Sequence, residues 1–286
     1  MKRVLLTMML MVLSLPAAAQ PAPNAHPTGG TVVGGSATLS FNGTTTTITQ
    51  STQRAAVNWQ DFDVGSQQTV TFAQPSSSAA ILNRVVGPDP SQIAGKIDAN
   101  GQVVLVNQSG VTFYDGAQVN AAGLVVSTAD VTTKNFMAGK LAFSEAGGAN
   151  AAIVNDGAIT IADAGLAALV APRVANAGTI TAKEGRVILA GVKTATIDLF
   201  GDGLLTLADE GAVTQKPSGA TALVTNSGTI SAQGGKIELT AKAVDGVIEN
   251  LIQAGGTVKA SSVVLRGVGG AIVVTGSGYG SAKIQH

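Results

Sequence analysis

Apolar and small polar residues alternate along most of the chain, and short turn sequences separate the alternating runs. Residues 101–128 are typical: Val, Leu and Phe alternate there with small polar residues, and the segment contains no His, Cys or Lys. A period of two places successive side chains on opposite faces of a strand. Asn42-Gly43 lies between two such runs, which is a strong signal for a β-hairpin. The pattern predicts an all-β protein with tight turns.

Internal repeats indicate how these strands are organised. Residues 176–191 align without a gap with residues 226–241, and residues 155–170 form a weaker copy. Each copy reads turn, strand, turn, strand. Repeats of about 20 to 25 residues made of short strands predict a β-solenoid, in which each coil buries its apolar side chains against the next coil. A β-sandwich is the alternative, and it would show turns without a repeat of coil length.

The spacing of asparagines sets the predicted coil length. Asn155 and Asn176 are 21 residues apart, and Asn226 and Asn250 are 24 apart. The 50 residues from Asn176 to Asn226 are expected to hold two coils with an insertion. At about 22 residues per coil, the region after residue 50 is expected to form roughly ten coils, a shaft of some 50 Å.

Stacking of equivalent positions explains the residue types of the repeat. Asn and Gly suit the corners because they tolerate positive φ, and stacked Asn amides can hydrogen-bond along the axis. Aliphatic side chains of one copy are predicted to stack on those of the next at the strand spacing of about 4.8 Å. The predicted pairs are Ile180 on Ile230, Val187 on Ile237 and Leu189 on Leu239.

Composition agrees with this architecture and limits the possible partners. Gly accounts for 36 of 286 residues, aromatic residues for 3% and charged residues for 12%. Such a chain is too apolar for disorder and too rich in Gly and β-branched residues for helices. The formal net charge is zero and the basic residues are scattered singly, so neither a nucleic-acid partner nor an anionic membrane partner is expected. There is no Cys, so stability must come from burial without disulfides.

The N-terminus reads as a cleaved secretory signal. Met1-Lys2-Arg3 is followed by an apolar run that is too short to span a bilayer, and Ala17 and Ala19 precede Gln20 in an A-x-A cleavage pattern. Residues 1–19 are therefore expected to be removed. Residues 20–30 contain three prolines and are expected to form an exposed lead-in.

Few residues offer catalytic chemistry. His26 and His286 are the only histidines, so no His-dependent triad or multi-His metal site is expected. Asp61 and Asp63 are expected to alternate on one strand face and could form a carboxylate pair like those of β-helix enzymes that cleave polysaccharides. A solvated strand face explains them more simply. The glycine-rich residues 276–281 lack the context of a phosphate-binding loop and are expected to be a flexible tail. We therefore expect no enzyme, cofactor or metal site, with a polysaccharide-degrading β-helix enzyme as the alternative.

Residues 58–131 resemble the amino-terminal secretion domain of two-partner secretion exoproteins, the filamentous haemagglutinin and haemolysin family. The likeness continues through residues 133–143 to residues 154–159. It implies a right-handed parallel β-helix with an N-terminal β cap and accessory antiparallel hairpins. It also implies that an outer-membrane β-barrel translocator recognises the chain in the periplasm.

The signature tetrapeptide of that family, Asn-Pro-Asn-Gly, corresponds here to Asn107-Gln108-Ser109-Gly110. Asn107 and Gly110 keep the outer positions, whereas Gln108 takes the place of the proline that presets such a turn. The resemblance implies that these four residues contribute to recognition by the translocator.

Together these observations predict four segments. Residues 1–19 form the signal peptide, 20–30 the lead-in, 31–160 the two-partner secretion domain with its cap, and 161–286 a shaft of β-helix repeats. The expected function is that of a secreted, adhesin-like exoprotein or its secretion module. The expected partners are the translocator, a host or neighbouring-cell surface, and a second copy bound through the C-terminal coil around residues 260–278.

Overall fold

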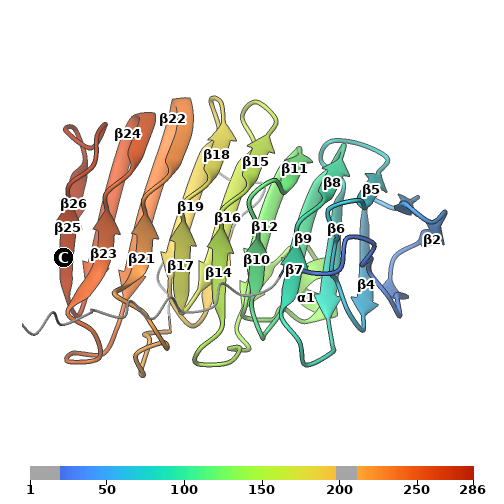
Figure 1. Ribbon diagram of the computed structural model, residues 1–286, viewed down its shortest axis with the longest axis horizontal. Coiled ribbons are helices and arrows are strands. Elements are labelled where there is room, and N and C mark those ends of the chain that lie inside the picture. The colour runs from blue at the N-terminus through green and yellow to red at the C-terminus, as the bar shows by residue number, and fades with distance from the viewer. Residues whose placement is uncertain (1–19, 198–210) are drawn as a thin grey trace, which may run out of the picture.

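The computed structural model describes residues 20–197 and 211–286, which wind into a parallel β-helix. The strands lie side by side along the long axis of the molecule, from the N-terminal cap to the C-terminus (Figure 1). The strands of the coils pair in parallel with the equivalent strands of the next coil, in three ladders that we call sheets 1, 2 and 3. The predicted fold class is thereby confirmed, and the sandwich alternative is wrong.

The three sheets form the wall of the β-helix, and β22 and β24 each run through a corner from sheet 1 into sheet 2. Sheet 1 comprises β3 (Thr45–Gln50), β5 (Thr69–Ala73), β8 (Lys96–Ala99), β11 (Gln118–Ala121), β15 (Ala158–Ile161), β18 (Thr179–Ala182) and the first parts of β22 (Thr229–Lys242) and β24 (Thr257–Val268). Sheet 2 comprises β4 (Arg54–Trp59), β6 (Ala80–Val85), β9 (Gln102–Val106), β12 (Gly123–Ser127), β16 (Leu166–Ala171), β19 (Arg186–Gly191), the remainder of β22 and β24, and β26 (Lys283–Gln285). Sheet 3 comprises β7 (Ser91–Ile93), β10 (Val111–Phe113), β14 (Ala152–Asn155), β17 (Arg173–Asn176), β21 (Ala222–Asn226), β23 (Asn250–Ala254) and β25 (Ala271–Val274).

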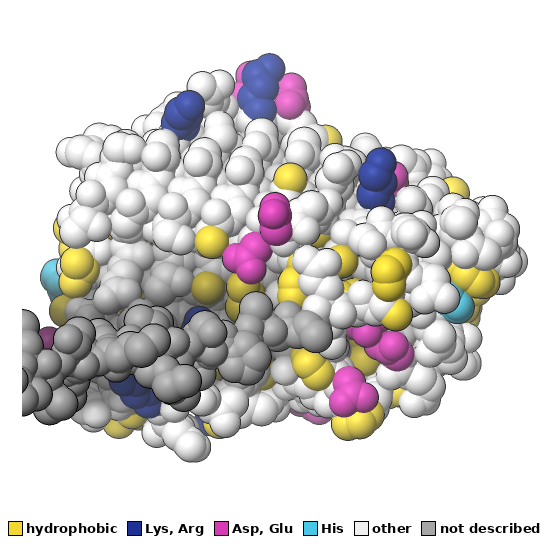
Figure 2. All heavy atoms as spheres, in the orientation of Figure 1, with side chains coloured by type: hydrophobic (Ala, Val, Ile, Leu, Met, Phe, Trp, Pro, Cys, Tyr) yellow, Lys and Arg dark blue, Asp and Glu magenta, His cyan; other side chains and the backbone are white. Residues whose placement is uncertain are grey.

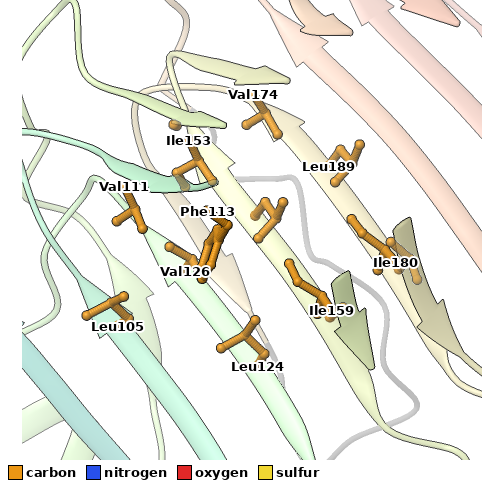
Figure 3. Close-up of a cluster of buried hydrophobic side chains, with 14 of the residues drawn as sticks. Leu105, Val111, Phe113, Leu124, Val126, Ile153, Ile159, Val174, Ile180 and Leu189 are labelled. Carbon is orange, nitrogen blue, oxygen red and sulfur yellow. The ribbon is translucent and has the colours of Figure 1, made fainter. Parts of the chain in front are cut away.

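Aliphatic columns fill the interior, and Figure 3 shows side chains from the surrounding strands converging there. Neighbouring strands are in the predicted register: Ile180 pairs with Ile230, Val187 with Ile237 and Leu189 with Leu239. All six side chains are buried. Each contributes on the order of 1.5 to 3 kcal/mol relative to exposure, so burial within the coils is a large source of stability.

A buried ladder of amides runs along one corner of the β-helix. Asn155 Nδ2 donates to Asn176 Oδ1, and Asn176 Nδ2 donates to Asn226 Oδ1, each at 2.7 Å. Asn226 Nδ2 in turn donates to the hydroxyl of Tyr279 at 2.9 Å. The predicted stacking of asparagines is confirmed. The expectation of a flexible tail at residues 276–281 is wrong at Tyr279, because this ring is buried and closes the ladder.

Three expectations about the coils are also wrong. Strands β17 and β21 pair directly, so the 50 residues from Asn176 to Asn226 make one coil with a long excursion, where two coils were expected. Asn250 pairs with Ala222, and the true equivalent of Asn226 is Ala254. Among the described residues sheet 3 has seven strands, fewer than the ten coils expected, because residues 128–151, 192–197 and 211–221 lie outside the three sheets.

These excursions cover a second apolar core on the outer face of sheet 2. The helix α1 (Thr133–Met137) buries Phe136 there, and β13 (Leu141–Phe143) pairs antiparallel with β20 (Ala195–Ile197). Outward-facing aliphatic residues of sheet 2 form the floor of this core, among them Leu82, Val104, Val125, Ala168 and Ile188. The accessory antiparallel structure is therefore a pair of strands distant in sequence.

An antiparallel cap closes the N-terminal end. Strand β1 (Thr31–Gly34) pairs with β4, and β2 (Ala37–Phe41) pairs with β3 as a hairpin. The predicted turn at Asn42-Gly43 is confirmed: Gly43 has φ +92°, and Asn42 Oδ1 accepts from the Thr45 N–H at 2.9 Å. Residues before β1 contact the first coil, since the Thr28 N–H donates to the carbonyl of Asp61 at 3.0 Å.

Candidate recognition site

The tetrapeptide Asn107–Gly110 forms a tight turn at the corner between β9 and β10. The Gly110 N–H donates to the Asn107 carbonyl at 3.0 Å, and Asn107 Oδ1 accepts from the Ser109 N–H at 2.9 Å. Gly110 has φ +117°, and a Cβ there would lie 2.8 Å from the carbonyl oxygen of Ala152. Asn107 is buried, whereas Gln108 and Ser109 are exposed. The outer residues of the tetrapeptide thus build the turn, and the middle two face solvent.

The buried amide of Asn107 also ties this turn to the preceding coil. Its Nδ2 donates to the carbonyl of Asp89 and to Ser91 Oγ, both at 3.0 Å. Ser109 Oγ adds a bond to the carbonyl of Pro88 at 2.6 Å. Five bonds, counting the two within the turn, therefore fix its conformation without a proline.

Gln108 connects the turn to the excursion that follows α1. Its Nε2 donates to the carbonyls of Glu145 and Ala146, each at 3.2 Å, and its own carbonyl accepts from the Gly148 N–H at 2.9 Å. Residues 88–91, 107–110 and 145–148 consequently form one surface, which we call the turn cluster. The sequence pointed to the tetrapeptide but not to its neighbours, because these contacts join segments about 20 and 40 residues apart.

A half-buried arginine holds the start of the same excursion. Arg84 Nε donates to both carboxylate oxygens of Asp130 at 2.9 and 2.8 Å. Its remaining nitrogens donate to Asn58 Oδ1 at 3.0 Å, to Thr133 Oγ1 at 3.1 Å and to the Val131 carbonyl. A guanidinium suits this role because its planar fork of donors is rigid and always charged. Arg84 therefore fixes the N-terminus of α1 against sheet 2, a role that sequence reasoning missed.

The two carboxylates considered for catalysis lie after β4, and no strand includes them. Asp63 Oδ1 accepts from the Gln92 N–H at 2.7 Å. Burial raises the pKa of Asp63 to about 6, with smaller contributions from the negative charges of Asp61 and Asp89, while the Gln92 hydrogen bond opposes the rise. Burial likewise raises the pKa of Asp61. Asp63 thus serves a structural hydrogen bond between neighbouring coils.

Most of the predicted signal-cleavage site lies outside the described residues. Ala17 and Ala19 lie outside the described residues, and Gln20 is the first residue within them. The described ranges contain no cluster of three or more His, Cys, Asp or Glu side chains suited to a metal ion. In the same ranges no helix has both the length and the hydropathy of a membrane span.

Known proteins resemble this chain over most of its length. The family model of the TPS secretion domain matches residues 24–284. The crystal structure of the HMW1 secretion domain from Haemophilus influenzae has a TM-score of 0.70 and 28% identity, covering 85% of this chain and 71% of that chain. The agreement in fold therefore covers most of this chain.

Two curated relatives match a shorter part. The heme/hemopexin-binding protein of Haemophilus influenzae strain KW20 Rd is 43% identical over 105 residues, which is 37% of this chain and 12% of the relative. A heme/hemopexin-binding protein from Haemophilus influenzae is 45% identical over 85 residues, 30% of this chain and 9% of the relative. The matched region thus spans about a tenth of the length of these relatives.

TPS domains interact with an outer-membrane TpsB translocator, and TPS exoproteins are secreted across the outer membrane to the cell surface via the periplasm. The family match covers the cap and nearly every coil, and a solved secretion domain has the same fold. This chain therefore belongs to the TPS secretion domain family of two-partner secretion exoproteins and reaches the cell surface by that route.

Proposed function

We propose that the translocator recognises this chain through the turn cluster, with Gln108 and Ser109 as the exposed residues of the contact. The single observation that carries the proposal is the difference in burial between the outer and the middle residues of the turn. Asn107 and Gly110 are buried, whereas Gln108 and Ser109 are exposed at a corner built from three segments. A docking partner would meet a preformed surface, which limits the entropy lost on binding.

The test is secretion by cells that contain the cognate translocator. A double variant, Gln108→Ala with Ser109→Ala, should lower the secreted fraction and leave the protein in the periplasm. Gln118→Ala is the matched control, because Gln118 is an exposed glutamine on the outer face of sheet 1. Urea unfolding of both purified variants reports whether the fold is retained. Secretion of the double variant at the level of the control would contradict the proposal.

Folding on the outside of the cell supplies a driving force in this proposal. The interior core is continuous along the coils, so each new coil buries its aliphatic side chains on the one already formed. One coil contributes several such side chains at about 1.5 to 3 kcal/mol each before conformational entropy is subtracted. Sequential coiling would then prevent the exported chain from sliding back.

We also propose an adhesive role for the exposed face of sheet 1. Its outward column consists largely of small uncharged polar residues, and the upper left of Figure 2 shows an area with few charged or apolar side chains. The successive positions of that column are Thr71, Asp98, Asn120, Thr160, Thr181, Ser231 and Lys259, so five of these seven residues are small and uncharged. Such a flat hydroxyl-rich surface suits a contact with neutral glycans of another cell.

The adhesive role and the alternative role as a polysaccharide-degrading enzyme predict different experimental results. Cells that display the protein should adhere to glycan-coated surfaces more than cells without it, and Thr160→Lys with Thr181→Lys should reduce that adhesion. Incubation with neutral and acidic glycans should release no reducing or unsaturated ends. Turnover would favour the polysaccharide-degrading enzyme instead. What the chain shares with the heme/hemopexin-binding relatives is, in this proposal, the secretion step.

A further inference from the structure

The outer face of sheet 2 changes character beyond the second apolar core. Along one outward column Ala168 and Ile188 are followed by Glu238 and then Val264. At this point the face carries a groove of about 280 Å³ between strands β19, β22, β24 and β26. Its polar lining includes Arg186, Lys236, Glu238, Ser262, Arg266 and Lys283.

The groove is strongly basic although the chain as a whole has a formal net charge of zero. Four cationic side chains and one carboxylate line it. Among the described residues, ion pairs within 4.0 Å are formed by Arg84 with Asp130 and by Lys183 with Asp163, so no described carboxylate pairs with Lys236, Arg266 or Lys283 at that distance. A concave surface that gathers charge of one sign raises the local concentration of the opposite ion.

Two features hold the groove in shape. Arg266 Nε donates to Gln285 Oε1 at 3.0 Å, which links β24 to β26 across the groove wall. Glu238 lies between the cations and is half-buried. Burial raises the pKa of Glu238, and the nearby Arg266 and Arg186 oppose that rise. At neutral pH its charge offsets only part of the positive charge around it.

The volume and the charge of the groove indicate which class of ligand it can bind. Ligand pockets commonly occupy about 300 to 1,000 Å³, so a groove of about 280 Å³ suits one small head group better than a long polymer. A phosphate monoester carries about −1.5 to −2 charges and three acceptor oxygens, which match several cations better than a single carboxylate does. Arginine is well suited to phosphate because it can donate two parallel hydrogen bonds.

We propose that this groove binds the phosphorylated sugar head group of the glycolipid in the bacterial outer leaflet. The exported chain emerges beside that leaflet. A specific contact of this kind would retain the β-helix at the surface of the cell that secretes it. The inference goes beyond recognition by the translocator and does not depend on the turn cluster.

Binding to vesicles tests the groove with the intact protein. The probes are phospholipid vesicles that contain lipopolysaccharide and matched vesicles with chemically dephosphorylated lipopolysaccharide. The double variant Lys236→Gln with Lys283→Gln should bind the first about thirtyfold more weakly, from about 1 kcal/mol per lysine near an anionic surface. Lys96→Gln with Lys259→Gln removes the same charge from exposed positions on sheet 1 and should change binding less than twofold, while Glu238→Gln should strengthen it.

Several results would overturn the proposal. If both double lysine variants lost affinity for the vesicles equally, the binding would be a general attraction of charge. If the groove variant bound the vesicles as tightly as the unaltered protein, another surface would be responsible. Equal binding to both vesicle types, or none to either, would remove phosphate as the ligand. Soluble glucosamine 1-phosphate should compete with the vesicles and glucosamine should not. Urea unfolding confirms that the variants remain folded.

Discussion

Replacing Asn176 by alanine measures how strongly the buried amide ladder holds neighbouring coils together. Asn176 is the central member: it accepts from Asn155 and donates to Asn226, each at 2.7 Å. All three side chains are at most 1% exposed. Water therefore does not reach the groups that the substitution leaves without a partner.

The expected loss follows from those two bonds. Asn176→Ala leaves Asn155 Nδ2 with only a long contact of 3.4 Å to the Gly157 carbonyl, and it leaves Asn226 Oδ1 without a donor. A buried polar group that loses its partner costs about 1 to 3 kcal/mol, so the free energy of unfolding should fall by about 2 to 5 kcal/mol. Asn155→Ala should cost about half as much, because Asn155 Oδ1 already lacks a hydrogen-bond partner.

Equilibrium urea unfolding followed by circular dichroism gives both values. Asn120→Ala is the control: Asn120 is exposed and bonds to Asp98 at 2.8 Å, so its loss should change stability by less than about 1 kcal/mol. An unchanged m-value would indicate that the same surface is exposed on unfolding. Equal effects of Asn155→Ala and Asn176→Ala, or an effect of Asn176→Ala no larger than that of the control, would refute the reasoning.

Three further outcomes are expected. The pKa of Asp63 is raised to about 6 in the folded state, so its contribution to stability is full below about pH 4 and is lost as pH rises through 6. In the unaltered protein the free energy of unfolding in urea should fall by about 1 to 1.5 kcal/mol between pH 4 and pH 7, a value reduced for solvent screening of this half-buried group. Asp63→Asn should abolish that fall, and an unaltered pH profile of the variant would contradict this. Gly110→Ala should lower stability by about 1 to 3 kcal/mol and more than Gly43→Ala, since a Cβ at Gly43 meets no atom within 4 Å; thermal unfolding compares the two. Exposed Val274 at the C-terminal strand edge should promote concentration-dependent association, which sedimentation should show and Val274→Lys should weaken; a monomer at all concentrations would exclude it.

The stacked coils could be predicted from the sequence because their pattern is local. Alternation fixes which residues face inward, and Asn176 and Asn226 mark equivalent corners whatever lies between them. Asn250 was misleading for the same local reason: an asparagine also begins β23, and residue type alone does not distinguish that position from a corner. Which positions are equivalent in successive coils can be assigned only from the pairing of the strands.

The second core and most of the turn cluster could not be predicted in this way. Strands β13 and β20 have three residues each and lie far apart in the sequence, so neither shows a period. Gln108 reaches the carbonyls of Glu145 and Ala146, groups that every residue has. Contacts of this kind arise from the path of the excursion and leave no distinctive residue type in the sequence.

The antiparallel pairing of β13 with β20 has a consequence for timing. When the exported chain coils in order from the cap, residues 141–143 emerge first, whereas their partners at 195–197 follow only after β14 to β19. The cover over the second apolar core is thus completed late, and aliphatic side chains such as Val104 and Val125 stay exposed to solvent until then. In that interval the emerging chain is more exposed to proteases and to aggregation, so a pause in export before residue 197 should be more harmful than an equal pause near the C-terminus.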